Sequence, residues 1–130
     1  MRDNRPAEAV PLLRRAIAIR EATQGPDHPE LAWVLIALGV AELDVGDADG
    51  AIARLRRART NLGSNAEPQA RADVDWPLAR ALWLQARDRD EALALARSAR
   101  ADYLAGSPPR PELAEGITTW LEQVAPATAR

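Results

Sequence analysis

Several residue types are absent from this sequence or nearly so. It contains no cysteine, no phenylalanine and no lysine, and it has a single histidine. Without cysteine, the chain has no disulfide, no thiolate zinc ligand and no cysteine nucleophile. The single histidine, His28, leaves no second imidazole for a metal site. We therefore expect no metal and no cofactor.

The charge balance limits the partners further. All 17 basic residues are arginine, and 19 acidic residues give a formal net charge of -2. Binding nucleic acid by counterion release needs a net basic face, so we expect no nucleic-acid partner. The longest apolar run, Leu31 to Ala41, is about half of the ~20 residues that a membrane helix needs. The first residues also lack the apolar core of a signal peptide. These features predict a soluble cytoplasmic protein of one domain, without a membrane partner.

Alanine is the residue that is abundant, with 28 copies in 130 residues. Alanine has the best helix propensity and lets helix backbones approach closely. Some of these alanines belong to a sequence repeat. In each copy, a small residue is followed four positions later by an apolar residue or alanine, and three positions after that by alanine. The three copies are Ala9-Leu13-Ala16, Ala51-Leu55-Ala58 and Ala92-Ala96-Ala99. The second copy lies 42 positions after the first, and the third lies 41 positions after the second.

Helical periodicity and short linkers predict an all-α fold of antiparallel helices. The expected helices cover residues 6–23, 29–45, 48–62, 69–87, 89–105 and 110–124. No segment alternates as a strand does.

Capping residues mark the expected helix starts. Asp47 is an N-cap preceded by Gly46, which ends the previous helix, and Asp88 with Glu91 forms a capping box. A similar Asp-x-x-Glu start spans residues 27–30, and Pro6 fits a first helical position. Pro77 would interrupt a helix, so we expect a kink there or a late start near Asp75.

The second copy of the repeat resembles the tetratricopeptide repeat. Its first helix carries Leu38-Gly39, and its second helix carries Ala51, Leu55 and Ala58 at the spacing of that family. Leu35, Glu42 and Leu55 stand where the family pattern has tryptophan, tyrosine and phenylalanine. The resemblance implies an α-solenoid of helix pairs that binds proteins or peptides and is not an enzyme.

The longer period is similar to the kinesin-light-chain type of this repeat, which is widespread in bacterial signalling proteins. The segments that carry this likeness are residues 17–21 and 25–32. The last half resembles the repeat regions that follow the catalytic domain in some bacterial serine/threonine kinases, on residues 78–83, 92–97 and 120–121. The expected division is one array over 1–125, with a half repeat at 1–25, repeats at 26–65 and 66–106, a capping helix at 107–125 and a tail at 126–130.

The repeat phase predicts an open face at the first helix. If residue 4 corresponds to Gly46, the first unit lacks its first helix, and the apolar side of helix 6–23 lacks its usual cover. We expect that this chain is the C-terminal piece of a longer protein, or that it forms a homodimer through this end. The residues expected on that side are Val10, Leu13 and Ile17.

Other patterns that could carry chemistry favour structural interpretations. The acidic run at residues 44–50 places Val45 and Arg56 where a calcium loop needs carboxylates, so a turn with a cap is preferred. Ser64, Ser98 and Ser107 lack a nucleophile motif and fit a turn, a helix surface and an N-cap. The densest basic cluster, Arg54, Arg56, Arg57 and Arg59, is expected to be a solvated face.

The remaining candidate is the concave groove that the resemblance implies, lined by the first helix of each unit. Its expected lining is Trp33, Ile36, Val40 and Leu43 from one unit and Val74, Ala81, Leu84 and Gln85 from the next. Ile36 and Ala37 stand where kinesin-light-chain-like repeats have paired asparagines, so no peptide clamp is carried over. An apolar groove could bind an amphipathic helix, or a neighbouring chain could cover it. Trp33 could serve packing or ligand contact.

Overall fold

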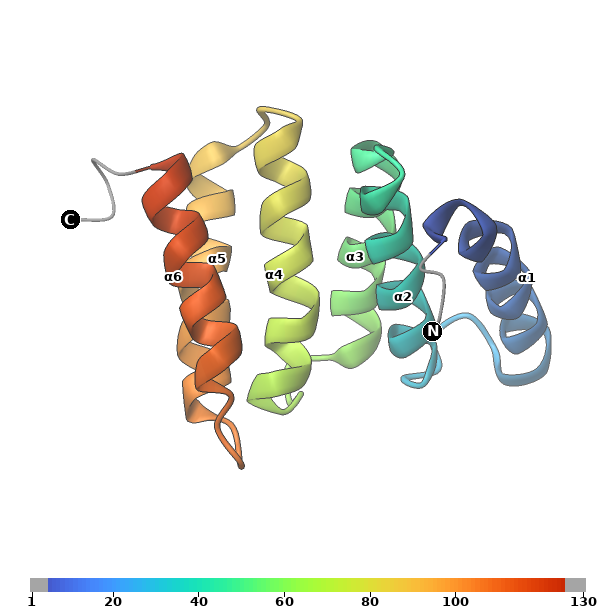
Figure 1. Cartoon of the computed structure of the whole chain (residues 1–130). Helices are drawn as coiled ribbons and strands as arrows, with labels where there is room; N and C mark the ends of the chain where they lie inside the picture. The colour runs from blue at the N-terminus through green and yellow to red at the C-terminus, as the bar shows by residue number, and fades with distance from the viewer. Residues whose placement is uncertain (1–4, 126–130) are drawn as a thin grey trace. The chain divides into compact units, whose positions relative to one another are not determined.

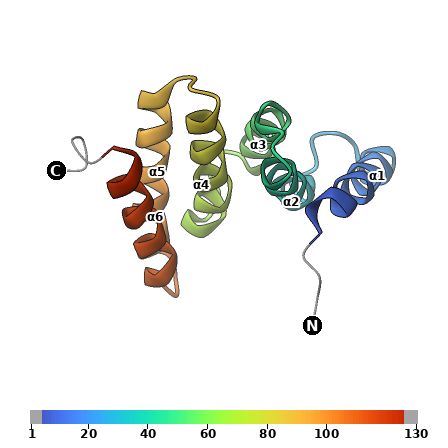
Figure 2. The same ribbon diagram turned by 45° about the horizontal axis from the view of Figure 1, so that its top comes forward.

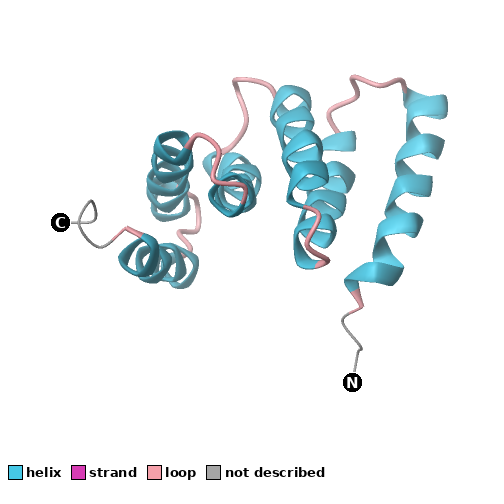
Figure 3. Ribbon diagram, turned by 90° about the horizontal axis from the view of Figure 1, so that it is seen from above, coloured by secondary structure: helices cyan, strands magenta, loops and turns pink. Residues whose placement is uncertain are grey.

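A computed structural model describes residues 5–125 of the chain. This part consists of six helices without a strand (Figure 3). The helices are α1 (Pro6–Gln24), α2 (Leu31–Asp44), α3 (Ala48–Leu62), α4 (Pro68–Leu84), α5 (Arg89–Ala105) and α6 (Pro111–Val124). They form two compact units, unit 1 (Met1–Asn65) and unit 2 (Ala66–Arg130), which are described separately below.

Unit 1 is built around the antiparallel pair α2–α3, with α1 packed on α2 (Figure 1). The close approach within the pair requires a glycine. A Cβ atom added to Gly39 of α2 would lie 2.7 Å from Leu55 Cγ of α3. Leu55 is fully buried, and Leu35 and Leu38 of α2 complete the interior. The Leu38-Gly39 pair therefore sets the distance at which the two helices cross.

Unit 2 repeats the same pair as α4–α5, and α6 packs on α5 (Figure 2). Leu78 and Ala79 of α4 occupy the places of Leu38 and Gly39 and are fully buried. The residues that α6 buries are Ala114, Ile117 and Leu121. Their spacing of three and four positions gives α6 one apolar stripe, so it covers the pair on one side only.

The turns inside the two pairs have the same hydrogen bonds. In unit 1, Gly46 N–H donates to Leu43 O and Asp47 N–H donates to Glu42 O. In unit 2, Ala86 N–H donates to Trp83 O and Arg87 N–H donates to Leu82 O, 40 positions further along. Gly46 and Ala86 both have a left-handed backbone, with φ of 90° and 53°. Alanine thus takes a position that favours glycine.

The helix starts confirm some predicted caps and correct others. Asp47 caps α3, since its Oδ1 accepts a hydrogen bond of 2.9 Å from Gly50 N–H, and Pro6 is the first residue of α1. The predicted capping box at Asp88 is wrong, because Asp88 has a left-handed φ of 46° and its side chain accepts no cap hydrogen bond. The predicted Asp-x-x-Glu start of α2 is also wrong. There the Nδ1 atom of His28 accepts from Glu30 N–H at 3.1 Å.

Helix α4 differs most from its prediction. It begins at Pro68 and continues through Pro77 to Leu84, so the predicted late start near Asp75 is wrong. Pro77 lacks an N–H group and removes one helical hydrogen bond. The helix nevertheless buries nine side chains along its length, and Pro77 is one of them. Burial of this face compensates for the missing hydrogen bond.

Candidate functional site

The predicted groove residues of α2 fall into two groups. Trp33 is 52% exposed, Ile36 and Val40 are half-buried, and Leu43 is buried. Trp33, Ile36 and Val40 are spaced by three and four positions and therefore lie on one side of α2. We call these three residues the α2 stripe. Leu43 is 8% exposed and belongs to the core of unit 1.

The predicted groove residues of α4 are placed differently. Val74 and Ala81 are fully buried, whereas Leu84 is 67% exposed and Gln85 is half-buried at the end of the helix. Val74 and Ala81 are thus core residues, and their selection as groove lining needs correction. The reason is a register error. The first helices of the two pairs align at 40 positions, as the turn hydrogen bonds show.

This alignment identifies the true counterparts of the α2 stripe. They are Asp73, Trp76 and Arg80, which are all half-buried. Asp73 accepts a hydrogen bond of 2.6 Å from the buried hydroxyl of Tyr103 on α5. Burial raises the pKa of Tyr103 above its ordinary value, and the hydrogen bond to Asp73 raises it further. Sequence reasoning missed these residues because it aligned the helices one position out of register.

Three tryptophans meet on this side of unit 2. The Trp120 ring of α6 contacts the Trp76 and Trp83 rings of α4 edge-on, with centroids 5.3 and 5.8 Å apart. Two guanidinium groups stack on the cluster, with Arg80 4.8 Å from the Trp76 ring centroid and Arg89 4.4 Å from that of Trp83. Such edge contacts and cation–π contacts each contribute about 0.5–1.5 kcal/mol. The α4 counterpart of the α2 stripe is therefore partly covered by α6.

A second candidate site is a charged pocket inside unit 1. Glu42 of α2 is 1% exposed, and its carboxylate pairs with Arg14 of α1 at 3.2 Å and Arg54 of α3 at 3.5 Å. Gly50 leaves room for this group, since a Cβ atom there would lie 2.6 Å from Glu42 Oε2. A buried carboxylate needs such pairing to offset the loss of hydration.

The predicted solvated face of the arginine cluster at residues 54–59 is only partly correct, because two of its members line this pocket. Arg57 pairs with Glu21 and donates to Pro26 O at 3.2 Å, and both Arg54 and Arg57 are about two-thirds buried. Only Arg56 and Arg59 of the cluster are exposed. The predicted solvated face therefore holds for half of the cluster. The one sequence signal of this site was Glu42 at a core position of α2.

The predicted self-association residues of α1 are also divided. Val10 and Ile17 are buried, because α1 packs on α2, so neither belongs to an open face. Leu13 is half-buried, as are Ala9 and Ala16. Their repeat counterparts on α3 and α5 are completely buried, and these are Ala51, Leu55, Ala58, Ala92, Ala96 and Ala99. The open side of α1 is thus the side that its equivalents use to contact a partner helix.

Comparison with known proteins gives one family match, which covers just under half of the chain. The sequence model of the tetratricopeptide repeat family matches residues 1–63. The first unit is therefore similar to tetratricopeptide repeats. No curated protein and no solved structure matches the chain. The predicted all-α fold class of tetratricopeptide-like helix pairs is confirmed.

The matching family has a known general role. Tetratricopeptide repeats generally mediate protein–protein interaction and are scaffolds without catalytic machinery of their own. Among residues 5–125, no cluster of three or more histidine, aspartate or glutamate side chains could hold a metal ion. Within the same range, none of the helices is both long and apolar enough to cross a membrane.

Proposed function

We propose that the chain is a protein-interaction module in which the α2 stripe of the tetratricopeptide repeat contacts the partner. The exposure of Trp33 carries this proposal. A tryptophan that leaves half of its surface in water gains little from folding, whereas it contributes strongly when a partner buries it. Ile36 and Val40 extend the apolar surface over two further turns of α2.

The comparison with unit 2 supports this assignment. On α4, the equivalent surface holds Trp76, and Trp120 of α6 packs against it. On α2, the equivalent residue is Ile36, and Trp33 beside it stays 52% exposed. The same helix face is therefore partly covered in unit 2 and open in unit 1.

The chemistry of the α2 stripe favours an amphipathic helix as the occupant. Apolar residues spaced by three and four positions match the spacing of anchors on a partner helix. Ala37, which is exposed between Ile36 and Val40, lets a partner backbone approach closely. An extended peptide would need polar groups that pair with its backbone, and the three side chains of the stripe have none apart from the indole N–H.

Two substitutions test the stripe against a matched control. Trp33→Ala and Ile36→Asp should each reduce capture of peptides from a display library of amphipathic helices by tenfold or more. Leu104→Ala on α5 is the control, because Leu104 is also 52% exposed but lies outside the stripe. Circular dichroism verifies that each variant keeps its helices. Equal capture by all four proteins would refute the role of the α2 stripe.

A second candidate function is self-association through α1. It is favoured by the half-buried Ala9, Leu13 and Ala16 and by two exposed apolar side chains, Leu12 at 68% and Ile19 at 56%. A second copy of the chain that covered this side would form a homodimer. The dependence of molecular mass on concentration distinguishes this function from the first one.

We propose further that the module acts inside a bacterial signalling protein in the cytoplasm, as a non-catalytic region beside other domains. The kinesin-light-chain-like spacing and the likeness of residues 78–83 and 92–97 to kinase C-terminal repeats support this proposal. On this view residues 1–125 form one array, with a half repeat, two repeats and a capping helix. A kinase catalytic domain encoded in the same reading frame would support the proposal, and an unrelated genomic context would contradict it.

A further inference from the structure

The open side of α1 carries a regular pattern of small and large residues. They are spaced alternately by three and four positions, and we call them the α1 seam: Ala9, Leu12, Ala16, Ile19 and Thr23. Leu12 and Ile19 are 68% and 56% exposed, and the two alanines are half-buried. Two helices that pair along their length in a coiled coil use this spacing. The seam therefore has the form of a helix-pairing surface.

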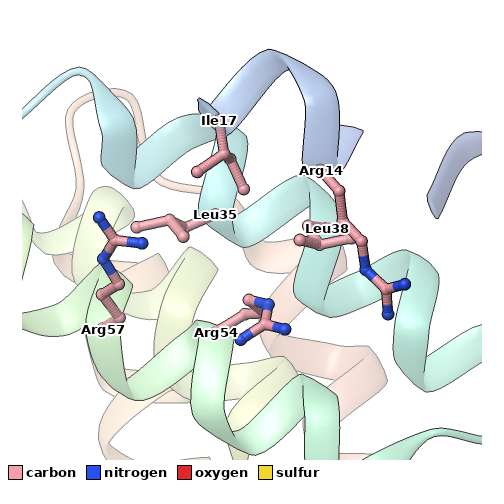
Figure 4. Close-up of a pocket in the computed structure, with 6 residues that line it drawn as sticks. All are labelled: Arg14, Ile17, Leu35, Leu38, Arg54 and Arg57. Carbon is pink, nitrogen blue, oxygen red and sulfur yellow. The ribbon is translucent and has the colours of Figure 1, made fainter. Parts of the chain in front are cut away.

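The α1 seam points away from the core of unit 1. Figure 4 shows Arg14 and Ile17 of α1 on the side that meets Leu35 and Leu38 of α2. Ile17 is 6% exposed. At 3.6 residues per turn, Leu12 lies about 140° from Ile17 around the helix axis. Figure 1 shows α1 at the edge of unit 1, so a helix of another chain can approach the seam.

The α1 seam is complementary to itself when two copies run in opposite directions. An antiparallel pair centred near the middle of α1 places Ala9 against Ile19 of the second copy and Leu12 against Ala16 of the second copy. Each layer then joins one small and one large residue, which fills the interface evenly. A parallel pair would place each residue against itself. Its alanine layers would leave cavities and its leucine layer would be crowded.

The charges beside the α1 seam favour the same orientation. Arg15 and Arg20 flank the seam on opposite sides, and both are exposed. In a parallel pair, Arg15 of each copy would lie against Arg20 of the other copy, which gives two repulsive contacts. An antiparallel pair separates these residues. It brings together only the two Arg15 side chains, which meet beside the two-fold axis.

We propose that α1 pairs with α1 of a second copy in antiparallel orientation along the α1 seam, and that Arg15 limits the affinity of this dimer. The proposal rests on the self-association function described above and gives it a geometry. A second copy is the occupant because the seam supplies its own complement in size. The contact uses the same surface on both copies, so it closes at two copies and forms no filament.

A charge reversal at Arg15 tests the contact at the axis. Arg15→Glu replaces one repulsion by another in its own dimer, whereas a mixed dimer with the parent protein joins opposite charges. Native mass spectrometry of an equimolar mixture should therefore show more than half of the dimers as mixed. A parallel pair predicts instead a stronger dimer of Arg15→Glu alone, because each glutamate would meet Arg20. Random mixing, or strengthening of the pure Arg15→Glu dimer, would overturn the proposal.

An added leucine separates a packed seam from general apolar attraction. Ala16→Leu enlarges a residue that faces Leu12 of the second copy, so it should weaken the dimer by about tenfold or more. Circular dichroism verifies that the helices are kept. A surface that associates only because it is apolar would bind more tightly after this change. Stronger association of Ala16→Leu in sedimentation equilibrium would contradict the close approach of the two helices.

Cross-linking measures the orientation directly, because the chain has no cysteine of its own. With a short bismaleimide, Arg15→Cys beside the axis should link to itself. Glu8→Cys and Ala22→Cys, both at exposed positions on the flank of Arg15, should link only when the two variants are mixed. In the antiparallel pair, the two copies of position 8 lie about 20 Å apart along the axis. Self-linking of Glu8→Cys and of Ala22→Cys would show a parallel pair.

The outcomes separate this geometry from the functions proposed above. A protein that stays monomeric at every concentration would refute both the antiparallel pair and self-association through α1. A dimer with the cross-links of a parallel pair would refute the geometry alone. Peptide capture by the α2 stripe is measured independently, since the α1 seam and the α2 stripe lie on different helices.

Discussion

At the residue scale, one glycine determines how closely the helices of unit 1 approach. Gly39 has no space for a methyl group, because Leu55 Cγ lies 2.7 Å from the position of its Cβ atom. Ala51, on the opposite helix, is fully buried. Interiors at this packing density do not absorb added carbon atoms without strain. Small residues at these positions are therefore required by the fold.

Enlarging either residue should destabilise the protein. We expect Gly39→Leu and Ala51→Leu each to lower the free energy of unfolding by about 1–3 kcal/mol. The matched control is Gly116→Ala on α6, where an added Cβ atom meets no other atom within 4 Å. That change should raise stability by about 0.5–1 kcal/mol, because alanine is the better helix residue. Urea unfolding measures all three, and neutral results for the leucine variants would contradict this helix crossing.

The charged pocket could not be predicted from the sequence, because its paired residues lie far apart along the chain. Arg14 and Glu42 are 28 positions apart, and Glu21 and Arg57 are 36 positions apart. No local spacing rule connects such residues, because only the packing of α1 and α3 on α2 brings them together. Glu42 alone gave a signal, as a charged residue in a stripe of core positions. The α2 stripe was easier to predict, since its three residues follow one helix period.

At the element scale, the sequence predicted helix starts and helix ends about equally well. Prolines and Asp47 mark where α1 and α3 begin, and both starts agree with the structure. The end of α4 was placed at residue 87 instead of Leu84, because no glycine follows the helix. Ala86 has the left-handed backbone that Gly46 supplies in the first pair. A turn that uses alanine there leaves no compositional signal.

Reciprocal substitutions at these two turns should have opposite effects. Ala86→Gly relieves the left-handed strain of alanine, and we expect a gain of about 0.5–1 kcal/mol after the entropy of the unfolded glycine is included. Gly46→Ala introduces that strain and should cost about 1 kcal/mol. Thermal unfolding of both variants, compared with the parent protein, measures the difference. A stabilising Gly46→Ala change would show that the two turns are not equivalent.

At the scale of the whole molecule, the repeat explains which alanines are structural. The small residues of α3 and α5 are fully buried against the other helix of their pair, whereas Ala9 and Ala16 of α1 are half-buried. The repeat period could be recognised in the sequence because each helix pair needs small residues at the same positions of its second helix. The sequence could not show which side of α1 is open. Val10 and Ile17 are as apolar as Leu13, and only the structure shows that they are buried where α1 packs on α2.

The open side of α1 yields a prediction about the oligomeric state. If a second copy covers Leu12 and Leu13, the mass measured by light scattering should rise from the monomer value of 14.1 kDa toward twice that value as concentration increases. Leu12→Glu should prevent this rise without unfolding the protein, because Leu12 is 68% exposed. Leu104→Glu, at an exposed position of α5, is the control and should dimerise like the parent. A mass that stays at the monomer value at every concentration, with the amides of α1 fully protected from hydrogen exchange, would rule out self-association and leave the α2 stripe as the proposed partner surface.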